Sequence, residues 1–213
     1  MQRIAIIDYG MGNLHSAQKA LQLVAGDQAE VIISQQPEQI EAADRVVLPG
    51  VGAMGDCMQA LVSSGLDQSL RQVLAQGQPL LGICVGMQML MQSSAESGGT
   101  QGLGILPGQL TRLAGGLDAQ GHKLKVPHMG WNQVRQEPHP LWQGINDHSR
   151  FYFVHSYCLP AGLERSIGHS QHGQEFTAAV SHNNLFATQF HPEKSHQAGL
   201  QLLANFVRWS GQA

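Results

Sequence analysis

Charged residues are scarce in this chain of 213 residues: they make up 13% of it, and neither sign dominates. The formal net charge is −3, so no basic surface of the kind that binds nucleic acid is expected. Hydrophobic residues make up 42%. So few charges beside so much apolar material are typical of a compact globular protein, and they argue against a disordered tail or a coiled coil.

Long apolar runs are missing as well. The first apolar stretch covers only residues 4–7 before Asp8 ends it. It is too short for the hydrophobic region of a secretion signal and far too short to span a bilayer. We therefore expect neither a targeting segment nor a membrane span.

Cysteine is sparse, and the spacings that bind metals are absent. The three cysteines form an odd set: Cys57, Cys84 and Cys158. We expect no disulfide framework and a reducing, cytoplasmic location. The sequence contains no H-E-x-x-H and no paired C-x-x-C. The nearest ligand-like pair lies in residues 169–172, which are more typical of a polar loop, so neither a metal nor a cofactor is expected.

Short apolar segments alternate with helical patterns through the first half of the chain. Strands are predicted at residues 3–8, 31–33, 45–48 and 79–83. Helices are predicted at residues 14–24, 58–74 with a break at Gly65, and 85–91. Continuous apolar strands that alternate with amphipathic helices indicate a parallel sheet with helices on both faces.

The second half has a different pattern. Residues 151–157, 176–181 and 185–190 are strand-like, and His-Asn-Asn at 182–184 joins the last two as a hairpin. A final helix is predicted from 195 to 209. With no repeat and no linker visible, we expect one domain over residues 1–213. Its fold class would be three-layer α/β, with a mostly parallel central sheet and an antiparallel portion.

A candidate nucleophile, Cys84, lies between the strand at 79–83 and the helix after it. Residues 82–86 read Gly-Ile-Cys-Val-Gly, the nucleophile-elbow pattern with cysteine in place of serine. A sharp turn lifts the middle side chain out of the fold, and the glycines remove Cβ clashes where backbones crowd. The start of the helix favours a thiolate, and the N–H of Val85 can face an oxyanion. Cys57 and Cys158 lack such a context and are expected to be core residues.

His191 and Glu193 are candidates for the base and the group that orients it. They are two apart on an extended segment and so face the same side, and Pro192 keeps the backbone extended there. A carboxylate beside an imidazole fixes its tautomer, as in catalytic triads. Taken alone, His191 could equally be a hydrogen-bonded strand-end histidine, and Glu193 an acid at a helix N-terminus.

Together these residues resemble the class I glutamine amidotransferases. That family has a cysteine elbow followed by Gln, here Gln88, then a late His-Pro-Glu, and a glycine-rich oxyanion loop that matches Pro-Gly-Val-Gly at 49–52. The resemblance implies L-glutamine as substrate, oxyanion donors at Val51 and Gly52 besides Val85, and substrate binding by Gln88, with Glu96 as a further candidate. The two glycines of the loop would let a peptide plane rotate at low cost.

Two further segments resemble the members of this family that serve histidine biosynthesis. They are residues 8–14, Asp-Tyr-Gly-Met-Gly-Asn-Leu, and residues 127–132, Pro-His-Met-Gly-Trp-Asn. The resemblance implies a separate (β/α)8-barrel cyclase as partner in a heterodimer. It places these residues at the interface: Asn13, Pro127, His128, Met129 and Trp131. Without the resemblance, residues 9–13 are an ordinary strand–helix turn and residues 127–132 a packed loop with a half-buried Trp131.

Three other functions are compatible with parts of this pattern. One is a glutaminase for another synthase, such as those that make pyridoxal phosphate or anthranilate; residues 127–132 discriminate against it. Another is a cysteine peptidase or related hydrolase on a similar α/β sheet. An α/β-hydrolase would place its acid before its histidine, and here the acid comes last. The third is a non-catalytic interaction protein that kept the fold, which the intact Cys84, His191 and Glu193 disfavour.

Overall fold

A parallel sheet forms the centre of the computed structural model, which describes residues 1–117 and 120–212. Its five strands lie in the order β2-β1-β3-β4-β16, all parallel. They are β1 (Gln2–Ile7), β2 (Ala29–Ser34), β3 (Arg45–Gly50), β4 (Leu80–Cys84) and β16 (Leu185–Thr188). The α/β class and the mostly parallel core predicted from the alternating pattern are confirmed.

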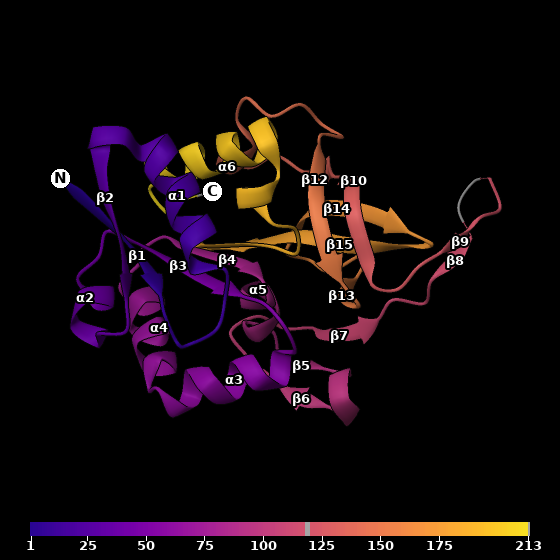
Figure 1. Cartoon of the computed structure of the whole chain (residues 1–213), viewed down its shortest axis with the longest axis horizontal. Helices are drawn as coiled ribbons and strands as arrows, with labels where there is room; N and C mark the ends of the chain where they lie inside the picture. The colour runs from indigo at the N-terminus through magenta and orange to yellow at the C-terminus, as the bar shows by residue number, and fades with distance from the viewer. Residues whose placement is uncertain (118–119, 213) are drawn as a thin grey trace.

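Helices cover both faces of this sheet (Figure 1). On one face lie α1 (Leu14–Ala25) and α6 (His196–Arg208). On the other lie α2 (Pro37–Glu41), α3 (Met54–Ser63) and α4 (Leu66–Ala75), and the short α5 (Val85–Met89) follows β4. The predicted break at Gly65 separates α3 from α4, where its φ of +75° suits a residue without a Cβ.

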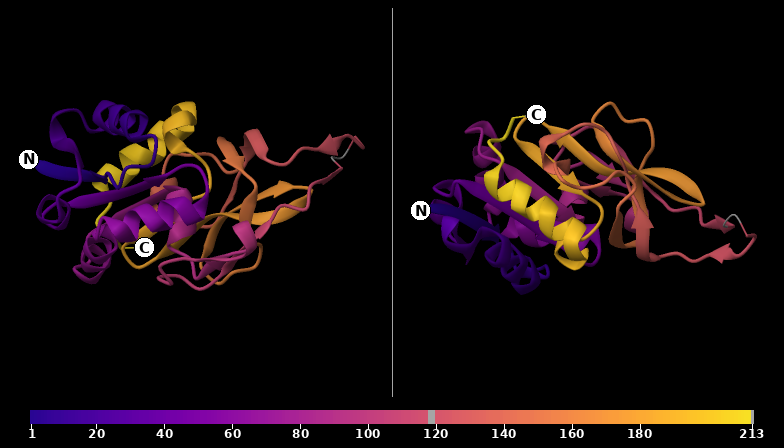
Figure 2. Two further views of the ribbon diagram at one scale, coloured as in Figure 1. Left: turned by 60° about the horizontal axis from the view of Figure 1, so that its bottom comes forward. Right: turned by 90° about the horizontal axis from the view of Figure 1, so that it is seen from above.

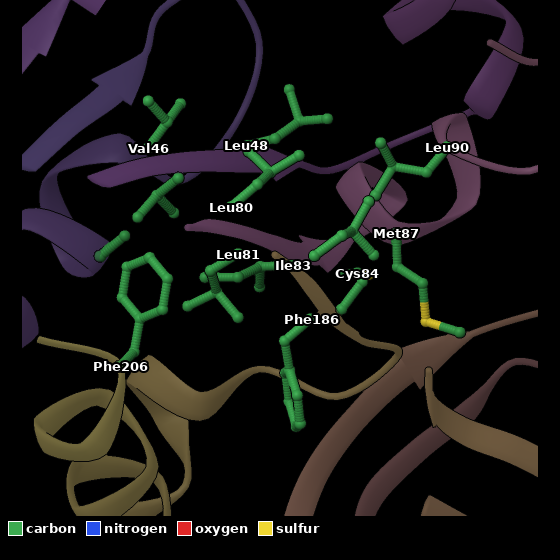
Figure 3. Close-up of a cluster of buried hydrophobic side chains, with 14 of the residues drawn as sticks. Val46, Leu48, Leu80, Leu81, Ile83, Cys84, Met87, Leu90, Phe186 and Phe206 are labelled. Atoms are coloured by element: carbon green, nitrogen blue, oxygen red, sulfur yellow. The ribbon is translucent and has the colours of Figure 1, made fainter. Parts of the chain in front are cut away.

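The core is built from the strands' continuous apolar runs. Leu48 and Leu81 of the central strands are fully buried and pack with Phe206 of α6 in one cluster (Figure 3). Because parallel strands covered on both faces have no solvent-exposed side, every residue of β3 and β4 is buried.

A mostly antiparallel extension, in which only the pair of β5 and β7 is parallel among the described strands, continues the sheet beyond β16. The hairpin predicted at 182–184 is present: β15 (Gln174–His182) pairs with β16, and His182 lies opposite Leu185. The order then runs β15-β13-β7-β5-β6. In addition, β14 pairs with β15, and β11 pairs with β14. These strands are β13 (Tyr157–Pro160), β7 (Gln109–Arg112), β5 (Ser93–Ser94), β6 (Thr100–Gln101), β14 (Ser166–His172) and β11 (Arg135–Gln136).

Two ribbons form separate sheets of two strands each. β10 (His128–Gln133) pairs with β12 (Arg150–His155), and β8 (Gly116–Leu117) pairs with β9 (Lys123–Leu124) in a ribbon that extends away from the body (Figure 2). Short 3-10 turns complete the chain: η1 (Gly26–Gln28), η2 (Glu96–Gly98), η3 (Pro140–Trp142) and η4 (Pro192–Lys194). In the described part of the chain, no helix has the length and apolar character needed to cross a membrane.

Two segments expected to be loops are strands. Residues 169–172 lie in β14, and residues 128–132 lie in β10. Their buried positions hold small or polar side chains, such as Gly168, Ser170 and His128, so the period-two apolar signal of a strand is absent. The strand predicted at 151–157 also divides, into β12 and β13, which pair in different sheets.

Candidate active site

Cys84 ends β4 at the carboxyl edge of the sheet, and α5 begins at the next residue. Its φ of 55° and ψ of −111° are a strained combination for a residue with a Cβ. The side chain is 4% exposed, and its sulfur lies 3.8 Å from the carbonyl oxygen of Val154. The strand–turn–helix predicted around Cys84 is therefore present, with the backbone strain that such turns hold.

The glycines of the elbow are required by close backbone packing. A Cβ on Gly86 would lie 1.9 Å from the carbonyl oxygen of Leu48 in β3, and one on Gly82 would lie 3.0 Å from the Cβ of Ala187 in β16. The backbone of β3 thus leaves room only for hydrogen at position 86, and a side chain at position 82 would require its neighbours to shift.

His191 and Glu193 meet beside Cys84. Nδ1 of His191 lies 2.8 Å from Oε1 of Glu193, and the two side chains are 4% and 2% exposed. Backbone contacts hold the segment: the N–H of His191 donates to Tyr152 O at 2.9 Å, and Ser195 Oγ donates to His191 O at 2.6 Å. The tertiary fold therefore joins β4 to a segment more than a hundred positions later in the chain.

The surroundings of His191 keep its imidazole protonated. Burial by itself lowers the pKa, but interactions with Cys84 and Glu193 outweigh it and raise the pKa from the ordinary value of 6.5 to about 10. An imidazolium held between the nucleophilic cysteine and a carboxyl group is an arrangement suited to nucleophilic catalysis by cysteine.

This raised pKa predicts a pH-dependent contribution to stability. Because the folded-state pKa exceeds the unfolded value, the contribution is fully present below pH 6.5 and is lost as the pH rises through about 10. The free energy of unfolding of the parent should exceed that of a His191→Gln variant most at about pH 6 and least near pH 10. Urea titrations across this range measure the difference; a difference that grew with pH would contradict the assignment.

Gln88 is connected to Cys84 through Gln189, a residue that the sequence pattern did not single out. Its side chain is 5% exposed and donates to Gln189 Oε1 at 3.1 Å. Gln189, fully buried, has its own amide nitrogen 3.9 Å from Cys84 Sγ. The spacing of Gln189 two positions before His191 on an extended segment is the signal that could have identified it.

The predicted oxyanion loop lies next to this cluster. Gly50, at its start, is in register with Cys84, and a cavity of about 10 Å³ is lined by Val51, His191 and Glu193, among others. Such a cavity holds at most about one water molecule. Within the described residues, the N–H groups of Val51 and Gly52 have no hydrogen-bond acceptor, so both are available as donors. The N–H of Val85 is the first of α5 and has no intrahelical partner.

Glu96, the further candidate for substrate binding, is bonded to the start of α3 in this structure. Its Oε2 accepts a hydrogen bond at 2.8 Å from the N–H of Met54, the first residue of α3. In this structure Glu96 therefore caps the helix that follows the oxyanion loop. Among the described residues, no hydrogen bond joins Glu96 to Cys84 or Gln88.

The residues predicted to meet a partner are divided between surface and core. Met129 and Trp131 lie on the same side of β10 and are 64% and 42% exposed. Trp131 stacks on His196 with ring centroids 4.9 Å apart. His128 faces inward, and Asn13 lines the small cavity beside His191. Pro127, which follows a cis peptide bond, leads into the strand.

A family comparison decides what kind of site this is. The profile described as "Glutamine amidotransferase class-I" matches residues 5–209 of the chain. The chain is a class I glutamine amidotransferase. The Cys-His-Glu cluster of this amidotransferase is thus formed by the elbow and the His-Pro-Glu segment on which the resemblance rested.

Individual relatives agree with this assignment, and a solved structure shares the fold. The amidotransferase is 52% identical to "Imidazole glycerol phosphate synthase subunit HisH 1" of Pseudomonas aeruginosa, covering 100% of this chain and 99% of that one. It is 53% identical to the HisH subunit of Nitrosospira multiformis over 98% of this chain and 99% of that one. The structure of PurLQS from Thermotoga maritima contains a chain with the same fold, with 16% identity, a TM-score of 0.70, and coverage of 97% and 98%.

Proposed function

We propose that this amidotransferase is the glutaminase subunit of an imidazole glycerol phosphate synthase. It hydrolyses L-glutamine to L-glutamate and ammonia, and the ammonia passes to a separate cyclase subunit in histidine biosynthesis. The observation that carries the proposal is the buried Cys84–His191–Glu193 cluster in a chain that aligns over its whole length with HisH subunits. Three free cysteines are consistent with a cytoplasmic location.

In the proposed reaction, the Cys84 thiolate attacks the side-chain carboxamide carbon of glutamine. The C–S bond forms, and the carbonyl oxygen becomes an oxyanion that accepts hydrogen bonds from Val85 N–H and from Val51 or Gly52 N–H. The His191 imidazolium, oriented by Glu193, gives its proton to the leaving ammonia as the C–N bond breaks.

Water then completes the turnover. His191, now neutral, takes a proton from a water molecule that attacks the thioester; the C–S bond breaks and glutamate leaves. Gln88 would contribute to holding the amino-acid end of glutamine. Glu96 bonds Met54 N–H through Oε2 only, so its other carboxylate oxygen could still accept a hydrogen bond from the substrate.

The partner in this proposal is a (β/α)8-barrel cyclase, which forms a heterodimer with the glutaminase. It consumes the ammonia together with a phosphoribulosyl-formimino carboxamide ribotide. Its products are imidazole glycerol phosphate and an aminoimidazole carboxamide ribotide. The names of the relatives, all subunits of a synthase, support a two-component enzyme.

Glutamate release from glutamine tests the proposal. It is measured for the chain alone, with the cyclase, and with the cyclase plus its ribotide ligand. Strong stimulation by the loaded cyclase supports both the chemistry and the partner. Release without stimulation would reassign the acceptor enzyme, and no release under any condition would remove the glutaminase assignment.

Trp131 is expected to anchor the cyclase. Exposed aromatic side chains at an interface contribute disproportionately to binding, so Trp131→Ala should weaken affinity or coupling by more than about 1 kcal/mol. Titration calorimetry with the cyclase measures the affinity. Leu117→Ala is a matched control, since Leu117 is also exposed, at 65%, but lies on the β8–β9 ribbon. Equal affinity of parent and Trp131→Ala, with unchanged stimulation, would remove the anchor role.

A further inference from the structure

Two buried side chains that the proposed reaction does not use bond to the oxyanion loop. Tyr9, which follows β1, donates its hydroxyl to Pro49 O at 2.7 Å. Cys57, in the first turn of α3, donates its thiol to Val51 O at 3.3 Å. They are 5% and 0% exposed. The loop is therefore held by groups from two elements that are far apart in the sequence.

The two accepting carbonyls belong to peptide units that are separated by one other peptide unit. Pro49 O lies in the peptide that also contains Gly50 N–H, and Val51 O lies in the peptide that contains Gly52 N–H. Since a peptide unit is planar, neither can rotate without breaking its side-chain hydrogen bond. The unit between them, which contains Gly50 C=O and Val51 N–H, has no side-chain hydrogen bond in the described part of the chain.

Close packing restricts the start of the loop further. A Cβ on Gly50 would lie 2.9 Å from the Tyr9 hydroxyl and 2.8 Å from the N–H nitrogen of Gly86. The tyrosine hydroxyl thus lies against the loop backbone at the point where that backbone passes the elbow. A bulkier residue at position 50 would displace both.

Both donors keep their protons at neutral pH. Burial raises the pKa of Tyr9, and the neighbouring thiols Cys57 and Cys84 raise it further. Burial also raises the pKa of Cys57, which its hydrogen bonds with Tyr9 and Val51 offset only in part. A protonated hydroxyl and a protonated thiol can donate to carbonyl oxygens, whereas their anions cannot.

We propose that Tyr9 and Cys57 are positioning residues for the glutaminase reaction. By holding the peptides on either side, they confine movement of the oxyanion loop to the Gly50–Val51 peptide and direct the Val51 N–H to the developing oxyanion. The inference rests on the proposed function, because it gives these residues a role only if Cys84 cleaves glutamine through an oxyanion.

The test uses the full-length chain with the loaded cyclase. Tyr9→Phe removes one hydroxyl, and Cys57→Ala removes the thiol, without changing the residues that form the triad. Because one misplaced oxyanion donor affects the transition state more than the bound substrate, kcat for glutamate release should fall about tenfold in each variant. KM for glutamine should stay within about twofold of the parent.

Two comparisons separate positioning from packing. Cys57→Ser keeps a donor at the same place and should retain kcat to within about twofold of the parent. Cys158→Ala removes an equally buried thiol outside the loop and should leave kcat unchanged. Thermal unfolding of every variant accompanies the kinetics, and circular dichroism checks that each is folded.

The outcomes distinguish the inference from the function on which it rests. Parent-like kcat in Tyr9→Phe and Cys57→Ala, with Cys84-dependent release in the parent, would overturn the inference and leave the glutaminase assignment intact. A fall in kcat in Cys57→Ser equal to that in Cys57→Ala would overturn the role of the donor at Cys57. If the parent itself shows no Cys84-dependent release, the proposed function fails first.

Discussion

Replacing Cys84 by alanine is expected to lower glutamate release by at least about 10⁴-fold, because it removes the nucleophile of a covalent mechanism. No other thiol can substitute. Cys57 and Cys158 are fully buried, and burial raises the pKa of both, to about 11 for Cys158. The measurement is glutamate formed at saturating glutamine in the presence of the loaded cyclase.

Chemical labelling gives an independent check on the same residue. An electrophilic glutamine analogue should add once to the parent chain, at Cys84, and not at all to Cys84→Ala. Cys158→Ala is the matched control and should keep both the activity and the label. A Cys84→Ala chain that released glutamate within about tenfold of the parent's rate would show that the nucleophile is another group.

Replacing Gly86 by alanine is expected to be the most damaging change that leaves every catalytic side chain in place. The added methyl group would lie 1.9 Å from Leu48 O, a backbone atom in the middle of the sheet that no side-chain rotation can move. Overpacking of this kind should lower the free energy of unfolding by about 3 kcal/mol. It should also displace α5 from β3 and lower glutamate release by about 100-fold, because the Val85 N–H moves with the helix.

Gly55 provides the comparison for this prediction. It also lies in a helix, α3, but a Cβ there would meet only Thr100, with Oγ1 at an ordinary contact distance of 3.5 Å. Gly55→Ala should therefore be neutral or stabilise the fold by up to about 1 kcal/mol, through the better helix propensity of alanine. Urea unfolding measures both variants; Gly86→Ala with the stability and activity of the parent would disprove the close approach.

The parallel half of the fold could be predicted because its signals are local. The runs that form β1, β3 and β4 are continuous and apolar, and each is followed by a helical pattern or a glycine turn. The antiparallel half gave weaker signals. β10 and β14 place Gly130, Ser170 and several histidines where an apolar side chain would mark a strand, and their pairing depends on partners far away in the chain.

The candidate site divides in the same way. The glycines around Cys84 and the Pro192 between His191 and Glu193 specify local backbone geometry, so the sequence alone indicated the nucleophile and its companions in the order of a known family. No local sequence pattern identifies Gln189, Tyr9 or Cys57. A glutamine, a tyrosine or a cysteine in the core is recognised as functional only from the residues that it contacts. Those contacts exist only after β1, α3 and β16 have packed around the elbow.

Residue order and local stereochemistry were therefore sufficient to predict the α/β class and the elbow, and, with the family resemblance, to propose Cys84, His191 and Glu193 as the catalytic residues. Only the tertiary structure brought Cys84 to His191 and raised the pKa of that imidazole. It also placed the Tyr9 hydroxyl on Pro49 and one carboxylate oxygen of Glu96 on the first N–H of α3. The physical reason is the distance along the chain over which each interaction acts. Turn and helix preferences act over a few residues, whereas burial, electrostatic interaction and hydrogen bonding between distant segments depend on the complete packing of the chain.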